Sequence, residues 1–210
     1  MDRAPRDRET RSPASAARDR ILLSAASLFA GGRIRVTGVD SLIARADVAK
    51  ATFYRHFPSK DDVVAAWLHT PEARWLDVVA GELEGTPPLV RLVDFWGAMG
   101  RWAEADGYHG CPFLNTLGEI RDPDHPASPL VSTYIGEVEA YLSSAALEAG
   151  IHDAASMGRQ LRFLTMGMWM AIVFEASISP AETARTMAVA LLAARLGTTA
   201  DDVERLVAAA

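Results

Sequence analysis

The chain has 210 residues, of which 50% are hydrophobic, and a formal net charge of −6, so it can bury a sizeable core. No run of about 18 uncharged apolar residues occurs and the N-terminal residues include no apolar stretch, so neither a membrane span nor a secretory signal is expected. Cys111 is the single cysteine, which excludes an internal disulfide and favours a reducing, cytoplasmic location.

The charge is distributed unevenly along the chain. Residues 1–60 contain 12 of the 21 Lys and Arg residues but only 6 of the 27 Asp and Glu residues. A basic module joined to an acidic body would be attracted to a nucleic-acid duplex and oriented by it. Residues 1–17 are polar and are predicted to form a flexible arm. The arm could reach a minor groove or remain a solvated tail, and the arginines concerned are Arg3, Arg6, Arg8 and Arg11.

The first predicted elements are short helices. Apolar residues recur at helical spacing from Ala17, and two glycines end that pattern after residue 30. Two further helices are predicted at 39–46 and 50–57, separated by a tight turn, and Thr37 could cap the first of them. Ser59 and Asp62 have the spacing of a capping box, which predicts a fourth helix over about 60–69.

The rest of the chain alternates helical patterns with short breaks. Thr70 and Pro71 predict a cap and a first helical residue for a helix that ends near residue 84. Almost no segment has the alternation of a strand, so the fold class is all-α. The other predicted helices cover about 88–104, 111–121, 129–149, 153–177 and 180–196, with a last short helix at the end.

The segment from 39 to 57 has the pattern of a helix-turn-helix motif, in which the second helix reads the major groove. We expect one set of its side chains to face inward, namely Val39, Leu42, Ile43, Val48, Phe53 and Phe57. The outward face of the second helix then carries donors that suit bases and phosphates. That set is Lys50, Ala51, Thr52, Tyr54, Arg55 and His56. Lys60 follows at a helix N-terminus, where a phosphate could bind.

At these residues the chain resembles the TetR family of transcriptional regulators. The resemblance covers about residues 18–67 and rests on the segment TGVDSLIARADVAKATFYRHFPSKDDVVAAW. It implies that Lys50, Ala51, Thr52 and Tyr54 approach bases or phosphates. It also implies that Thr37, Tyr54, His56 and Lys60 hold the DNA backbone, although His56 could instead be a packed link between two helices.

The resemblance also implies the organisation of the whole protein. It divides the chain into the arm, an N-terminal three-helix DNA-binding domain at 18–64, and a C-terminal helical ligand-binding and dimerisation domain at 65–210. The expected function is that of a homodimeric repressor, released from a palindromic operator in double-stranded DNA by a small apolar or amphipathic effector. A bacterial cytoplasmic location, on the nucleoid when bound, is implied. A ligand-activated activator remains an alternative.

Three residues depart from the family pattern. Asp47 replaces the turn glycine, and aspartate tolerates a left-handed backbone better than most residues. Ala49 replaces a serine that would cap the recognition helix, so the start of that helix should be less well held. Ala51 replaces a glycine and adds a methyl group that could contact a thymine methyl.

The C-terminal body offers candidates for a dimer interface and a ligand pocket. The segments 161–176 and 181–196 are apolar or rich in Ala and Leu, so we expect them to pair with their symmetry mates as a four-helix interface. Pocket candidates could equally be ordinary core residues. They are Trp96, Met99, Trp102, Phe113, Leu114, Asn115, Glu119, Tyr134, Phe163 and Met166.

Other classes of protein are disfavoured by the residues themselves. His109, Cys111, Asp124 and His125 match no standard zinc spacing, so neither a metal nor another cofactor is expected. No nucleophile elbow, P-loop or dinucleotide signature occurs, which argues against an enzyme. A purely structural dimeric scaffold is disfavoured by the helix-turn-helix pattern and the charge asymmetry.

Overall fold

The structure is a computed structural model that describes residues 13–210, and every regular element in that range is an α-helix. The elements are α1 (Pro13–Phe29), α2 (Val39–Ala46), α3 (Lys50–His56), α4 (Lys60–Leu68), α5 (Trp75–Glu82), α6 (Pro88–Ala105), α7 (Pro112–Glu119), α8 (Ser128–Glu148), α9 (Ala154–Glu175), α10 (Ser179–Leu196) and α11 (Ala200–Ala208). The predicted all-α class is therefore confirmed. Within these residues no helix is both long enough and apolar enough to cross a bilayer.

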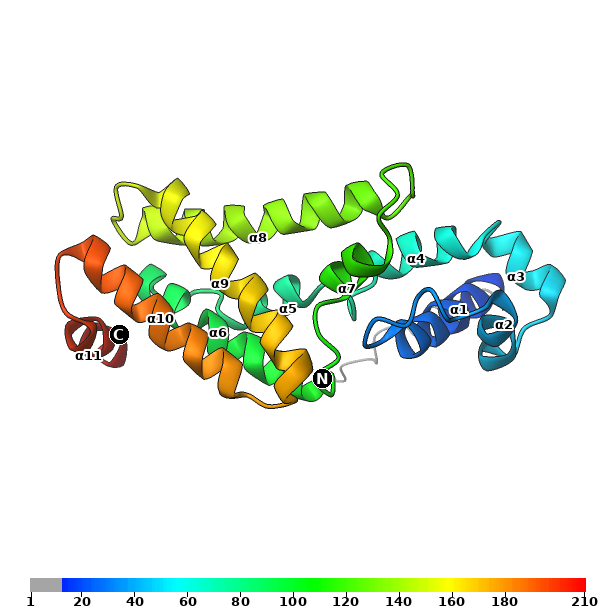
Figure 1. The fold of residues 1–210 in the computed structure, drawn as a ribbon, viewed down its shortest axis with the longest axis horizontal. Helices are drawn as coiled ribbons and strands as arrows, with labels where there is room; N and C mark the ends of the chain where they lie inside the picture. The colour runs from blue at the N-terminus through cyan, green and yellow to red at the C-terminus, as the bar shows by residue number, and fades with distance from the viewer. Residues whose placement is uncertain (1–12) are drawn as a thin grey trace, which may run out of the picture.

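The molecule is elongated, with the first three helices at one end and a bundle of long helices at the other (Figure 1). Helix α4 runs from the first group toward the bundle, and α7 lies between the two groups. We call α1 to α3, with the loop between α1 and α2, the head, and α5 to α11 the body. The body is built on the pairs α8–α9, α6–α10 and α9–α10, which pack over much of their length.

Two glycines allow the long helices of the body to cross closely. A Cβ on Gly158 of α9 would lie 2.8 Å from the backbone nitrogen of Ser143 in α8. A Cβ on Gly100 of α6 would lie 2.9 Å from the Cβ of Ala181 in α10. No real side chain tolerates such distances, so both crossings require the absence of a side chain at the contact.

An aromatic cluster fills the middle of the body. Trp75 is buried and touches Phe95, Tyr134 and Trp169, with ring centroids 6.1, 5.9 and 5.4 Å away. The Phe113 ring stacks on Tyr134 at 3.7 Å. Such rings each bury a large apolar area, so this cluster is the main hydrophobic anchor of the body.

Two predicted helix starts are wrong. Helix α1 begins at Pro13 rather than Ala17, with the proline at a favoured first position, so residues 13–17 are helix and not flexible arm. The rest of the arm, with Arg3, Arg6, Arg8 and Arg11, lies outside the described residues. The helix expected to begin at Pro71 begins at Trp75 instead. The Thr70 hydroxyl donates to the carbonyl of Trp67 at 2.8 Å and so terminates α4 rather than capping a new helix.

Candidate nucleic-acid interface

The helix-turn-helix is held together by the inward residues that the sequence predicts. Leu42, Phe53 and Phe57 are buried, and Val39, Ile43 and Val48 are partly buried against the same core. Phe53 packs beside Phe57, with ring centroids 6.3 Å apart, and the Arg18 guanidinium of α1 covers the Phe57 ring at 5.4 Å. The predicted assignment of this face to the core is confirmed.

The turn between α2 and α3 has a left-handed backbone at Asp47, the residue that stands in place of the turn glycine. Its φ is 50° and its ψ is 56°, and its backbone N–H donates to the carbonyl of Ala44 at 3.3 Å. The Arg20 side chain of α1 donates to the carbonyl oxygens of Ala46 at 3.0 Å and Asp47 at 3.4 Å. A charged donor from α1 thus fixes the turn, and the turn fixes the direction of α3.

Helix α3 begins without a side-chain cap. Ala49 has the extended backbone of an N-cap residue, with φ −67° and ψ 147°, but its side chain offers no hydrogen-bond acceptor. Its carbonyl accepts from the N–H groups of Thr52 and Phe53, at 2.8 and 3.0 Å. The first turn is therefore held by backbone bonds alone, which leaves orphan N–H groups at an exposed helix start.

The outer face of α3 is open to solvent. Lys50, Ala51, Tyr54 and Arg55 are exposed, and Thr52 is partly exposed. Tyr54 leans edge-on against the buried Phe53, with ring centroids 5.4 Å apart, which orients its phenol on the surface. This face combines cationic, hydroxyl and methyl groups, which are the groups that a major groove and its phosphates can bind.

Three of the predicted DNA-contacting residues are buried or partly buried in the structure. Thr37 is buried, and its hydroxyl donates to the carbonyls of Leu28 and Arg33 at 3.2 and 2.7 Å, so it braces the loop after α1. It does not cap α2 either, since Gly38 is the N-cap. His56 is partly buried, and its Nε2 has no partner among the described residues, which agrees with the alternative of a packed link.

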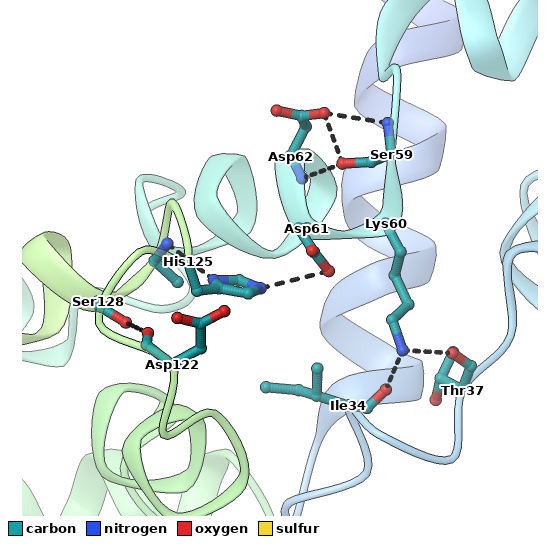
Figure 2. Close-up of polar contacts among 10 residues, drawn as sticks. Ile34, Thr37, Ser59, Lys60, Asp61, Asp62, Asp122, His125 and Ser128 are labelled. Carbon is teal, nitrogen blue, oxygen red and sulfur yellow. Dashed lines mark hydrogen bonds and ion pairs between the residues drawn. The ribbon is translucent and has the colours of Figure 1, made fainter.

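Lys60 likewise has partners within the protein. Its ammonium donates to the carbonyls of Ile34 at 3.1 Å and Thr37 at 3.3 Å, as Figure 2 shows. Beside it, the predicted capping box of Ser59 and Asp62 is confirmed, with bonds of 3.1 and 3.0 Å between each side chain and the other residue's backbone N–H. The side chains at the start of α4 thus make contacts within the protein, and the phosphate contact expected of Lys60 stays a prediction.

The pocket candidates divide into two groups. Those that line one small apolar cavity of about 20 Å³ are Phe113, Leu114, Tyr134 and Met166. Trp75, Cys111, Arg162 and Trp169 also line it and were missed, because α5, α8 and α9 converge there from distant parts of the sequence. Helical periodicity gives no signal for this convergence.

The remaining pocket candidates do not line this cavity. Trp96 and Met99 are fully buried core residues of α6. Trp102 packs edge-on against Trp169, with ring centroids 5.7 Å apart. Asn115 donates to the carbonyl of His109 at 2.9 Å. Phe163 and Glu119 are described below.

Glu119 faces the head rather than a ligand. Its two carboxylate oxygens accept from the backbone N–H groups of Ile34 at 2.9 Å and Arg35 at 2.7 Å. Phe163 is 59% exposed and belongs to an apolar surface on α9 and α10, with a shallow groove of about 260 Å³. Other exposed members of that surface are Met170, Val173, Phe174 and Met187.

The histidines and the cysteine do not converge. Within residues 13–210 no group of three or more His, Cys, Asp or Glu side chains is placed to hold a metal ion. Burial raises the pKa of the Cys111 thiol, which accepts a hydrogen bond from the Trp75 indole at 3.2 Å. A protonated, enclosed thiol has the character of a structural cysteine.

Comparison with known proteins identifies the head. The family profile described as "Bacterial regulatory proteins, tetR family" matches residues 21–67, the segment from α1 to α4. Among curated proteins none matches the chain.

Solved structures extend the similarity to most of the chain. SCO4454, a TetR-family transcriptional regulator from Streptomyces coelicolor, is 28% identical, with a TM-score of 0.76 over 86% of this chain and 96% of that chain. A protein of Streptomyces avermitilis described as a TetR-type regulator is 29% identical, with a TM-score of 0.66 over 77% and 88% of the two chains. A TetR-family regulator from Cytophaga hutchinsonii shares the fold, at 18% identity and a TM-score of 0.75, over 88% and 96%. Residues 21–67 therefore match the TetR family of helix-turn-helix transcriptional regulators, and the chain as a whole shares the fold of regulators of that family.

Proposed function

We propose that the protein is a homodimeric repressor that reads a palindromic operator through α3 and leaves it when a small apolar or aromatic effector binds in the body. The observation that carries the DNA-binding part is the solvent-open face of α3, with Lys50, Ala51, Tyr54 and Arg55 exposed on a helix fixed by a rigid turn. Residues 18–64 would bind DNA, with Thr52 at the groove, and residues 65–210 would bind the effector and form the dimer.

A second copy of the chain is needed for a palindrome, and the apolar surface on α9 and α10 supports it. Phe174 is 81% exposed, and Phe163, Met170 and Met187 each expose about half or more of their surface. Several large apolar side chains exposed on one pair of packed helices are typical of an interface between proteins. A two-fold pair of α9–α10 hairpins would place the two recognition helices on one side of the dimer, facing successive major grooves.

The cavity in the body is the proposed effector site. Its 20 Å³ has room for roughly one water molecule, so an effector must enlarge it by moving its walls. The lining by Trp75, Phe113, Tyr134 and Trp169 favours a flat aromatic or otherwise apolar molecule. Suppose that the effector prefers the state with the enlarged cavity and that DNA prefers the state with the closed cavity. By linkage, the effector then lowers the affinity for the operator, and DNA lowers the affinity for the effector by the same factor.

Selection from random duplexes tests the DNA-binding part. We expect a palindromic site whose affinity falls steeply with salt. Arg55→Ala should weaken binding to every duplex and reduce the salt slope by about one, whereas Arg101→Ala in α6, an equally exposed arginine of the body, should change neither. A selection that yields no sequence preference contradicts the proposal.

Two measurements test the dimer and the effector. Met187→Glu on the proposed seam should shift the protein to monomers in sedimentation, and Leu147→Glu, an exposed leucine of α8 outside that surface, should not. Mass spectrometry of molecules that co-purify with the protein should find an apolar compound that releases operator DNA. A Trp169→Ala variant that binds this compound as well as the wild type would contradict the proposed site.

A further inference from the structure

The head is clamped to the body by side chains that lie far from the DNA-reading face. The loop between α1 and α2, residues 30–38, is held from the body by Glu119 at the last residue of α7. Both of its oxygens accept backbone N–H groups, from Ile34 and Arg35. A carboxylate with two backbone donors is a strong and directional contact, because it is charge-assisted at both bonds.

The same loop is held from α4. Lys60 donates to the carbonyls of Ile34 and Thr37 (Figure 2). Ile34 is therefore held through its carbonyl by α4 and through its N–H by Glu119 of α7. The loop is thereby tied to the helix that leads to the body and to a helix that belongs to the body. A movement of α7 relative to α4 must strain this loop.

A second contact joins α4 directly to the body. His125, in the loop between α7 and α8, lies with its Nε2 atom 3.3 Å from Asp61 Oδ1 in the first turn of α4. The Nδ1 atom of the same ring accepts the backbone N–H of Ala127 at 3.0 Å. Because Nδ1 is an acceptor, the network assigns an N–H group to Nε2, the atom that faces Asp61.

The loop that carries His125 is itself braced. The Ser128 hydroxyl donates to the carbonyl of Asp122 at 2.6 Å, and the Asp122 carboxylate accepts the N–H of Asp124 at 3.0 Å. The His125 side chain is only 9% exposed, so its ring cannot swing away from the contact without losing its packing. His125 is therefore held in place by the body, and it contacts Asp61 in the first turn of α4.

We infer that Glu119 and His125 are positioning residues that set the angle of the head on the body, and through it the half-site spacing that the dimer accepts. One contact between two rigid parts leaves a pivot, but two separated contacts define an angle. In a two-fold dimer a change of that angle is doubled at the recognition helices. Neither residue lies on the DNA-reading face, so they would select spacing without selecting bases. The inference rests on the proposed dimer and palindrome.

The test measures affinity for the selected operator with its half-sites moved apart or together one base pair at a time. Each base pair shifts a half-site by about 3.4 Å and rotates it by about 35°. For each variant we compare the Kd for an operator one base pair off the best spacing with the Kd for the best spacing. The ratio of the first Kd to the second should fall about fivefold in Glu119→Gln and in His125→Asn, which means a weaker preference for one spacing. Glu119→Gln removes the charge and replaces one of the two accepting oxygens by an NH₂ donor. His125→Asn is too short to reach Asp61, while it can still accept from Ala127.

Matched variants separate positioning from folding. Asp61→Asn retains an oxygen that can accept from Nε2 and should keep the wild-type spacing profile, whereas Asp61→Ala should behave like His125→Asn. Glu84→Gln, an exposed acid of the body away from the junction, should have no effect. The bases preferred within each half-site should be unchanged in every variant.

A second measurement does not depend on DNA. Spin labels on Ala44→Cys, an exposed position of α2, should give one narrow distance between the two heads in the wild-type background and a broader distribution with Glu119→Gln. Folded variants with an unchanged spacing profile and an unchanged distance distribution would overturn the inference. Wild-type protein with no preference for a palindrome would instead contradict the proposed function on which the inference rests.

Discussion

Replacing Ala49 by serine restores a cap that α3 lacks, and the consequence can be worked out from the structure. Ala49 already has the extended backbone of an N-cap residue, so a serine there needs no rearrangement. Its hydroxyl would accept an N–H of the first turn, from Ala51 or Thr52. A change from alanine to serine at such a position is worth about 1 kcal/mol of helix stability. That energy corresponds to a roughly fivefold lower population of the frayed first turn.

Hydrogen exchange of the backbone amides measures this effect directly. In Ala49→Ser the amide of Thr52, which donates to the carbonyl of residue 49, should exchange about fivefold more slowly, since opening of the first turn limits its exchange. The affinity for DNA should rise by no more than the same factor for each head, because binding requires the formed helix. Ala44→Ser, at an exposed position inside α2, is the control and should not slow exchange in α3. Unchanged protection in Ala49→Ser would refute the conclusion that this helix is poorly capped.

Two further predictions concern the body. Gly158→Ala forces a Cβ against the backbone of Ser143 and should destabilise the fold by about 1–3 kcal/mol in denaturant melts, whereas Gly136→Ala, with open space around it, should be neutral or stabilising by about 0.5–1 kcal/mol. If both glycine variants melt alike, the close α8–α9 crossing is wrong. Cys111 should react with a thiol reagent at pH 8 roughly a hundredfold more slowly than in denaturant, because its raised pKa and its burial under Trp75 both suppress the thiolate, and fast labelling of folded protein would contradict this.

The head could be predicted from the sequence because local rules determine it. Phe53 and Phe57 have the spacing of an inward helical face, Ser59 and Asp62 form a capping box, and Asp47 replaces a turn glycine, and each of these features acts over a few residues. Its polar residues were harder to assign. Lys60 was expected at a phosphate, but it bonds to loop carbonyls that lie more than 20 residues away in the sequence. A long, flexible lysine side chain donates to whichever hydrogen-bond acceptors lie within reach, and tertiary packing determines which acceptors those are.

In the body, the helical periodicity of apolar residues does not predict which of them line the cavity. Trp96, Met99 and Phe113 look alike as apolar residues on amphipathic helices, yet only Phe113 lines the cavity. The difference arises from the way α5, α8 and α9 converge, and helix crossings of this kind depend on contacts such as that of Gly158, which periodicity does not reveal.

Helix α7 connects the parts of the molecule that the sequence presents as separate. Phe113 and Leu114, near its start, line the cavity, and Glu119, at its end, holds the loop of the head. A helix of eight residues spans only about 12 Å and cannot bend internally over that length, so it moves as one body. Any enlargement of the cavity that displaces Phe113 must therefore either displace Glu119 or be resisted by its two hydrogen bonds. The residues that fix the angle of the head are thus the residues through which the proposed effector site would have to act.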